Sequence, residues 1–220
     1  MHALRDNNGQ PAVHLVIVAD NGSTDGTGQL ALNAGATVIR ETRRGYGYAC
    51  MAGIAAAGDA DILLFVDGDN SVVIQEAASL LAAIDCGADL VIGSRINVES
   101  GAMTPPQRFG NWLACFITRF IWSVPISDLG PFRAARRTSL DHLGMKDMTY
   151  GRTVEMQIKA FQCSQQVVEV PVSLRCRIGH SKVSGTVRGV IGAGFGIFSM
   201  IAKLWWRERR RIPNHRTGRV

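Results

Sequence analysis

The chain has 220 residues, of which 46% are hydrophobic and 19% are charged, which excludes a disordered chain and fits one domain with a well-buried core. The net charge of +6 lies entirely in the last stretch, because residues 203–220 hold seven bases and one acid, whereas residues 1–202 hold 17 of each. We therefore expect a neutral body and a basic tail. The tail is either a solvated end or a contact with an anionic surface.

Cysteine usage indicates a reducing compartment. The five cysteines are widely separated and form no C-x-x-C pair, which argues against a disulfide framework or a zinc site. Free thiols of this kind are typical of cytoplasmic proteins. Residues 1–13 contain no apolar run of signal-peptide length, so we do not expect export by that route.

The first half of the chain alternates between short apolar runs and helical segments. Residues 14–19 are apolar and rich in β-branched side chains, which predicts a buried strand. The elements expected after it are a helix over 26–33, strand 37–41, an alanine-rich helix ending near Gly58, strand 62–66, helix 75–84 and strand 89–93. This alternation predicts an α/β fold with a mainly parallel sheet and helices on both faces.

The second half has a different pattern. Between Phe109 and Ile121 apolar residues recur at helical spacing, and we expect that face to be buried core rather than a membrane contact. A helix over 153–162 and a strand over 166–172 follow. Pro171 places that strand at an edge or an end. The chain closes with a glycine-rich apolar stretch and the basic tail.

Acidic side chains follow two of the expected strands. Asp20 and Asp67 stand at carboxyl ends, where open parallel sheets bind their ligands. Only Gly68 separates Asp67 from Asp69, so two carboxylates can reach one cation. Mg²⁺ and Mn²⁺ accept carboxylate oxygens together with substrate phosphates. This pair favours a metal site at Asp67 and Asp69, although an exposed turn that caps the next helix would be the better explanation if the pair stood alone.

Several motifs occur in an order that resembles a known enzyme family. They are Asp20-Asn-Gly-Ser-Thr-Asp25-Gly-Thr, Arg44-Gly-Tyr-Gly47, Gly58-Asp59, Phe65-Val-Asp67-Gly-Asp69 and Gly93-Ser-Arg95. Together they resemble the family 2 glycosyltransferases of GT-A fold. Three later segments are similar to the polyprenyl-phosphate (dolichyl-phosphate) mannosyl- and glucosyltransferase branch: Asp128-Leu-Gly-Pro-Phe-Arg133, Glu169-Val-Pro-Val172 and Arg177-Ile-Gly-His-Ser-Lys182. The family normally begins with one more strand, which this sequence is expected to lack.

The resemblance implies roles for individual residues. Donor binding is implied for Asp20, Ser23, Asp25, Gly45, Gly47 and Asp67. Metal binding is implied for Asp67 and Asp69, and catalytic roles for Asp69 and Asp128, the latter facing the transferring sugar or the acceptor. Phosphate and acceptor binding is implied for Arg95, Arg133, Arg177, Ser181 and Lys182, in keeping with fixed guanidinium donors. Structural ion pairs are an alternative for Arg95 and Arg133, and an ordinary loop for Ser181 and Lys182.

The implied reaction is inverting transfer of a hexose from a UDP- or GDP-hexose to a lipid phosphate acceptor, with Mg²⁺ or Mn²⁺ as cofactor. An anionic phosphate is already a nucleophile and needs no strong general base. Glu155 is a base candidate, but we expect it to form an i,i+4 helix pair with Lys159 instead.

We divide the chain into a GT-A domain over residues 1–186 and an apolar interfacial segment with the basic tail over 187–220. Nucleotide sugars are cytoplasmic, and the positive-inside rule keeps the tail on the same side. We therefore expect a peripheral cytoplasmic protein on the inner face of the membrane, with Trp205 and Trp206 at headgroup depth and arginines on anionic lipid. A helix buried against the body is the alternative.

Other functions explain fewer motifs. The run from Arg44 to Cys50, followed by Asp67, imitates a dinucleotide fingerprint, but Cys50 replaces the third glycine and Asp69 is left unexplained. An NAD-dependent oxidoreductase is therefore disfavoured. A nucleotidyltransferase, which shares the metal–diphosphate chemistry, and an inactive truncated membrane-associated relative stay as alternatives. Nucleic acid is not expected as a partner, because no stacking aromatics or known module accompany the tail.

Overall fold

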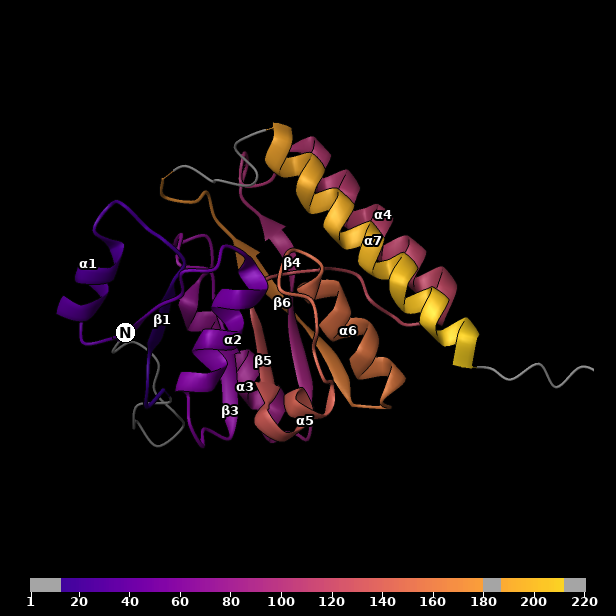
Figure 1. Cartoon of the computed structure of the whole chain (residues 1–220), viewed down its shortest axis with the longest axis horizontal. Coiled ribbons are helices and arrows are strands. Elements are labelled where there is room, and N and C mark those ends of the chain that lie inside the picture. The colour runs from indigo at the N-terminus through magenta and orange to yellow at the C-terminus, as the bar shows by residue number, and fades with distance from the viewer. Residues whose placement is uncertain (1–12, 180–186, 212–220) are drawn as a thin grey trace, which may run out of the picture.

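A computed structural model describes residues 13–179 and 187–211 of the chain (Figure 1). Its elements in order are β1 (Ile17–Asp20), α1 (Thr27–Asn33), β2 (Thr37–Arg40), α2 (Tyr46–Ala56), β3 (Ile62–Phe65), the 3-10 helix η1 (Ile74–Glu76), α3 (Ala77–Asp85), β4 (Leu90–Val98), α4 (Pro105–Trp122), β5 (Arg133–Arg136), α5 (Arg137–His142), α6 (Arg152–Gln162), β6 (Val167–Leu174) and α7 (Val187–Arg211). The strands and helices expected in the first half are all confirmed, with small shifts at their ends. The expected lack of a further strand before β1 concerns residues 1–16, most of which lie outside the described residues. Among the described residues β1 is the first strand.

The strands form two sheets. β1 and β2 pair in parallel and stand apart as a two-stranded sheet. The larger sheet has the order β3-β5-β4-β6, in which β4 and β6 run parallel and β5 runs antiparallel to both of its neighbours. β3, β4 and β6 therefore all point the same way, which confirms the predicted mainly parallel α/β fold.

The inserted strand β5 is absent from the expected elements, although it lies between β3 and β4. It has only four residues, Arg-Ala-Ala-Arg, and no β-branched run that would mark it as a strand. Ala134 and Ala135 are buried on opposite faces of the sheet, one beside α3 and the other beside α5 and α6. Small side chains suit a strand covered on both faces, and local pattern alone does not reveal that position.

Helices cover both faces of the larger sheet, as predicted. On one face α3 packs against the strands in a cluster that includes Leu80, Ile84, Val91 and Phe132. On the other face α2, α5 and α6 pack in a cluster that includes Ile54, Leu90, Ile92, Leu140 and Met156. Val91 faces α3, whereas Leu90 and Ile92 face the opposite way, because side chains alternate along a strand.

A third cluster joins α4, α6 and α7. Figure 1 shows α4 and α7 side by side along one flank of the molecule. Met200, Ile201 and Leu204 of α7 are buried against this cluster, so one face of the helix packs on the body. Phe195 and Trp206 on the same helix are exposed. Within the described ranges no helix is both long and apolar enough to cross a membrane.

The predicted burial of the apolar face of α4 is wrong for its aromatic residues. The helix buries Ala114, Cys115 and Thr118, with Ile117 and Ile121 partly buried beside them. The larger aromatic side chains instead face outward: Phe109, Trp112, Phe116 and Phe120 are each more than half exposed. The close approach of α7 leaves room only for small and aliphatic side chains between the two helices. The apolar residues of α4 do follow helical spacing, as predicted, but only the part of that face with smaller side chains is buried.

Candidate active site

The turn after β3 holds the pair of carboxylates expected to bind a metal. Asp69 accepts hydrogen bonds at Oδ1 from the backbone N (3.0 Å) and Oγ (2.6 Å) of Ser71, which fixes its orientation. Its Oδ2 lies 3.2 Å from Nη1 of Arg177. The backbone N of Ile178 donates to the carbonyl of Asp69 at 2.9 Å, so the segment after β6 lies against this turn. The structure thus joins two predicted site residues, Asp69 and Arg177, that are far apart in sequence.

Asp67 is held in an environment that disfavours its charge. Burial raises the pKa of Asp67, and the neighbouring Asp69 raises it further, while Arg133, Arg177 and Arg95 act in the opposite direction. A carboxylate with this balance gains from an added cation. The described residues contain no group of three or more His, Cys, Asp or Glu side chains that could enclose a metal by themselves. Two carboxylates on one turn fit a hard cation that takes its remaining ligands from phosphates and water.

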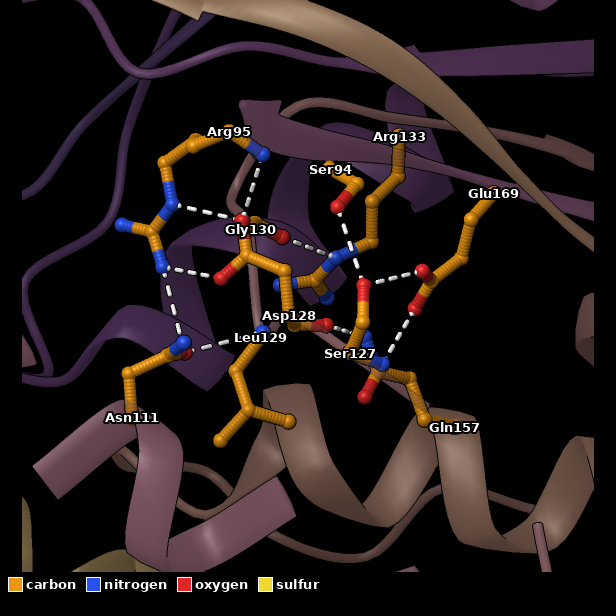
Figure 2. Close-up of polar contacts among 10 residues, drawn as sticks. All are labelled: Ser94, Arg95, Asn111, Ser127, Asp128, Leu129, Gly130, Arg133, Gln157 and Glu169. Carbon is orange, nitrogen blue, oxygen red and sulfur yellow. Dashed lines mark hydrogen bonds and ion pairs between the residues drawn. The ribbon is translucent and has the colours of Figure 1, made fainter. Parts of the chain in front are cut away.

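A largely buried ion pair joins Arg95 and Asp128 (Figure 2), and the charge of Arg95 also acts on the pKa of Asp67. Oδ2 of Asp128 accepts from both the backbone N and the Nε of Arg95 at 2.8 Å, and Oδ1 accepts from Nη2 at 2.5 Å. Asn111 of α4 extends the network, because its Oδ1 accepts from Nη2 of Arg95 (3.2 Å) and from the backbone N of Leu129 (3.0 Å). An ion pair of this kind was the structural alternative for Arg95, and its predicted phosphate contact stays a prediction; Asp128 positions that guanidinium with both of its oxygens.

Three further contacts hold the loop that contains Asp128. Ser127 donates its backbone N (2.7 Å) and its hydroxyl to the carboxylate of Glu169 on β6. Its hydroxyl also lies 3.0 Å from Oγ of Ser94 on β4. Gln157 of α6 donates to the carbonyl of Asp128 at 3.1 Å. Figure 2 shows these side chains converging on the loop from β4, β6 and α6, so the ion pair rests on rigid elements.

Two arginines are buried without a carboxylate partner within the described ranges. Arg133 donates from Nε to the carbonyl of Gly130 (2.7 Å), and its Nη2 has no hydrogen-bond partner. Arg152, at the start of α6, meets only the carbonyl of Asp147 (3.4 Å) and the sulfur of Met51 (3.2 Å), and its Nε has no partner. Both residues are at most 2% exposed. A buried cation is costly unless an anion accompanies it, so each of these guanidinium groups would gain from an anionic ligand, and the predicted phosphate contact of Arg133 stays a prediction.

The residues expected to bind the donor base gather at the end of β1, in the smaller sheet. Asp20 accepts from the backbone N of Ser23 at 2.8 Å, and hydrogen bonds from Ser23 lower the pKa of Asp20. Asp25 accepts from the backbone N (3.1 Å) and hydroxyl (2.5 Å) of Thr27 as α1 begins. These contacts shape the loop between β1 and α1, and the predicted donor roles of Asp20, Ser23 and Asp25 stay predictions.

The glycine-rich turn is held by Asn21, a residue to which the motif comparison assigns no role. Its amide donates to the carbonyls of Glu41 (3.0 Å) and Arg43 (2.6 Å), and its Oδ1 accepts from the backbone N of Gly45 (2.9 Å). A Cβ on Gly45 would lie 2.4 Å from the carbonyl oxygen of Met148, and one on Gly47 would lie 2.4 Å from its Cα. Both glycines therefore serve close packing of the backbone, whereas their predicted donor role stays a prediction.

Glu155 is engaged in structure, as predicted. It is buried, lies 2.8 Å from Nζ of Lys159, and accepts from the backbone N of Lys146 and of Asp147. It is therefore not free to act as a base. Ser181 and Lys182 lie outside the described residues. Sequence reasoning missed Asn111 and Arg152 as members of this region, because both depend on which elements meet in space rather than on a local motif. Glu169 stands within a quoted motif, but its contact with Ser127 was not predicted.

Comparison with known proteins places these features in context. The family model described as "Glycosyl transferase family 2" matches residues 2–144. An uncharacterized glycosyltransferase of Mycobacterium tuberculosis is 37% identical over 193 residues, covering 87% of this chain and 88% of the relative. A polyprenol monophosphomannose synthase of Mycolicibacterium smegmatis is 32% identical, covering 80% and 72%. A dolichyl-phosphate hexose transferase of Haloferax volcanii is 28% identical, covering 89% and 83%.

Solved structures share the fold at low sequence identity. A glucosyl-3-phosphoglycerate synthase of Mycobacterium tuberculosis, in complex with Mn²⁺, uridine diphosphate and phosphoglyceric acid, aligns with a TM-score of 0.68 at 20% identity over 95% of this chain and 72% of that one. A mannosyl-3-phosphoglycerate synthase of Rubrobacter xylanophilus aligns with a TM-score of 0.68 at 16% identity over 97% and 70%. At this level of identity the likeness concerns the fold alone.

Proposed function

The chain belongs to glycosyl transferase family 2, and from that premise we propose that it transfers a hexose from a UDP- or GDP-hexose to a lipid phosphate of the polyprenyl-phosphate type. Its GT-A fold and its glycosyltransferase class follow from the comparisons. The substrates are inferred from the site, where the carboxylates of Asp67 and Asp69 lie among three arginines. The names of the dolichyl- and polyprenol-phosphate relatives support the choice of acceptor.

Asp67 and Asp69 would hold Mg²⁺ or Mn²⁺, which supplies positive charge to the departing diphosphate. Burial, and after it the neighbouring charge of Asp69, raises the pKa of Asp67, and this cost of its charge supports the assignment. Arg177 already neutralises Asp69 from the segment after β6. We assign Arg177 a second role as a phosphate contact, because its guanidinium lies against Asp69, the carboxylate that would hold the metal beside the diphosphate.

Arg95 and Arg133 would bind phosphate groups of acceptor and donor. Asp128 holds Arg95 through both carboxylate oxygens, so its contribution to the reaction is to position that guanidinium. In the proposed step a phosphate oxygen of the acceptor forms a bond to the anomeric carbon while the bond to the diphosphate oxygen breaks, with inversion. The nucleophile is already anionic, so positioning and charge stabilisation are the main catalytic contributions.

We assign the nucleoside part of the donor to the end of β1, with Asp20, Ser23 and Asp25 as its contacts. Asn21 supports this assignment, because it ties that loop to the turn before α2. Residues 1–186 would form the catalytic unit. Residues 187–220 would serve peripheral attachment to the cytoplasmic face of an anionic membrane, which suits a donor found in the cytoplasm and an acceptor found in the bilayer.

The proposal is tested by release of UDP or GDP from nucleotide sugars, with Mn²⁺ and a water-soluble short-chain polyprenyl phosphate. We expect donor-dependent release that Asp69→Asn lowers at least about a hundredfold, as for loss of a main charge-stabilising group. Asp85→Asn, an exposed carboxylate at the end of α3, is the matched control and should retain full release.

Binding of the cation provides a second measurement that does not depend on turnover. Mn²⁺ should raise the melting temperature of the wild type and of Asp85→Asn, but not that of Asp69→Asn. Folded wild-type protein that releases no nucleotide from any UDP- or GDP-hexose would refute the proposed reaction. Undiminished release by Asp69→Asn would refute the assignment of the site.

A further inference from the structure

The exposed face of α4 is a continuous aromatic stripe. Phe109, Trp112, Phe116 and Phe120 are 60%, 57%, 53% and 82% exposed, at a helical spacing of three or four residues. Three of these rings contact one another: Phe109 and Trp112 are tilted with centroids 5.8 Å apart, and Trp112 and Phe116 are stacked with centroids 5.6 Å apart. An aligned row of this kind differs from scattered surface residues and marks an interaction site.

The charge around the stripe is almost wholly positive. The described side chains of α4 and α7 include the exposed bases Arg108, Arg119, Lys203, Arg207, Arg209 and Arg210. The one acid on these two helices, Glu208, accepts hydrogen bonds from the indole of Trp122 and from Gln162. Arg209 and Arg210 lie over the rings of Trp205 and Trp206, at 4.1 Å and 5.2 Å from the ring centroids. Aromatic rings flanked by bases are the composition of helices that lie in the interface of anionic bilayers.

The stripe is also adjacent to the candidate site. Asn111, on the same turns of α4 as Phe109 and Trp112, bonds Arg95 and the backbone of Leu129 (Figure 2). The helix that carries the aromatic stripe therefore also helps to hold the guanidinium assigned to phosphate.

We infer that the outer face of α4, together with the exposed face of α7, docks on an anionic membrane, with Phe109, Trp112 and Phe116 at headgroup depth. Interfacial docking suits helices that are too polar to span, since no described helix qualifies as a crossing segment. This inference rests on the proposed lipid acceptor, for which it supplies the orientation of the site. A protein partner is a weaker fit, because the exposed charges among the described side chains of α4 and α7 are all basic, whereas most protein contacts pair charges of both signs.

Vesicle flotation with the full chain tests the docking face without any donor or acceptor. We expect the wild type to float with mixed phosphatidylcholine–phosphatidylglycerol vesicles and to dissociate from them in high salt. It should not bind vesicles of pure phosphatidylcholine. The triple variant Phe109→Ser, Trp112→Ser, Phe116→Ser should partition into vesicles at least about tenfold less than the wild type, because burial of even one aromatic ring in the bilayer can account for about a tenfold gain in partitioning. The matched control Leu30→Ser, Leu32→Ser removes two exposed leucines of α1 and should float like the wild type.

Trp112→Phe allows a second measurement in a variant that keeps the stripe. Brominated lipid should quench a component of the tryptophan fluorescence that is present in the wild type and absent from Trp112→Phe. Equal flotation of the triple variant and wild type, or equal quenching of wild type and Trp112→Phe, would overturn the inference. So would a wild type that is dimeric in solution and does not float, with a monomeric triple variant, because the occupant would then be a second copy. Since flotation needs no turnover and release of nucleotide from soluble substrates needs no vesicle, each idea fails separately.

Discussion

Replacing Asp128 by asparagine tests whether the Arg95–Asp128 pair holds the site together. The substitution keeps the shape of the side chain but removes its charge and leaves only one oxygen to accept hydrogen bonds. The wild-type carboxylate takes three: two at 2.8 Å and one at 2.5 Å, all from Arg95. The Arg95 side chain is 16% exposed and that of Asp128 is 7% exposed, so neither charge can be fully compensated by water.

Breaking such a buried pair from one side costs about 3 kcal/mol, at the low end of the usual range because Arg95 keeps some solvent contact. For a chain of this size that corresponds to a fall in melting temperature of roughly 6–12 °C. Arg95→Met should cost a similar amount, because it leaves the Asp128 carboxylate buried alone. The double variant should cost no more than either single variant, which gives a coupling energy of about 3 kcal/mol.

Urea unfolding of the four proteins of this cycle measures the coupling directly. The matched control is Asp141→Asn, whose partner Arg137 lies 3.1 Å away in an i,i+4 pair with 60% of the Asp141 side chain exposed. That pair should contribute no more than about 0.5 kcal/mol. Additive losses in the Arg95 and Asp128 variants, or a cost for Asp128→Asn as small as that of the control, would show that the two residues do not depend on each other.

Two further outcomes follow from packing and from titration. Gly47→Ala should destabilise the protein by about 3 kcal/mol, because the added Cβ would lie 2.4 Å from the backbone of Met148. The control Gly53→Ala on the same helix meets only the Cβ of Ala19 at 3.9 Å, so it should be neutral or stabilising. Equal effects of the two variants in thermal unfolding would contradict the packing role of Gly47. Hydrogen bonds from the backbone of Gln166 and from Ser139 lower the pKa of Asp89 below its usual value of 3.8. The ionised Asp89 therefore contributes to the free energy of unfolding above pH 3.8, and this contribution is lost as the pH falls through the lowered pKa. In urea unfolding, Asp89→Asn should therefore lower the free energy of unfolding by about 1 kcal/mol at pH 7 and by progressively less below pH ~3.8. A difference between wild type and variant that stays constant with pH would show that the charge of Asp89 is not stabilised in this way.

Much of the fold could be predicted from the sequence because its signals are local. The apolar runs that became β1 to β4 end in turn residues or acids, and the alternation with helices predicts the sheet type. The i,i+4 spacing of Glu155 and Lys159 was enough to predict their ion pair. The Asp67–Asp69 turn and the Asp69–Arg177 contact lie within motifs that the family resemblance joins, although no local rule connects residues so far apart.

The features that escaped prediction depend on which elements meet. Ala134 and Ala135 look like helix or loop residues until β5 is inserted between two strands whose faces are already covered. The periodicity of α4 identified an apolar stripe, but the width of the contact with α7 decides how much of it is buried. Arg152 shows no sequence signal at all, because its burial results from the approach of α2 and α6.

The charges of the candidate site have a common physical consequence. Asp67 is buried beside the like charge of Asp69, and the buried guanidinium of Arg133 forms no ion pair within the described chain. Each of these charges is costly in the protein alone and would be stabilised by a ligand of opposite sign. A cation paired with phosphates supplies both signs at once, whereas a neutral ligand supplies neither. The site therefore favours a ligand that combines a cation with phosphate groups, as a metal-bound diphosphate does, over a neutral one.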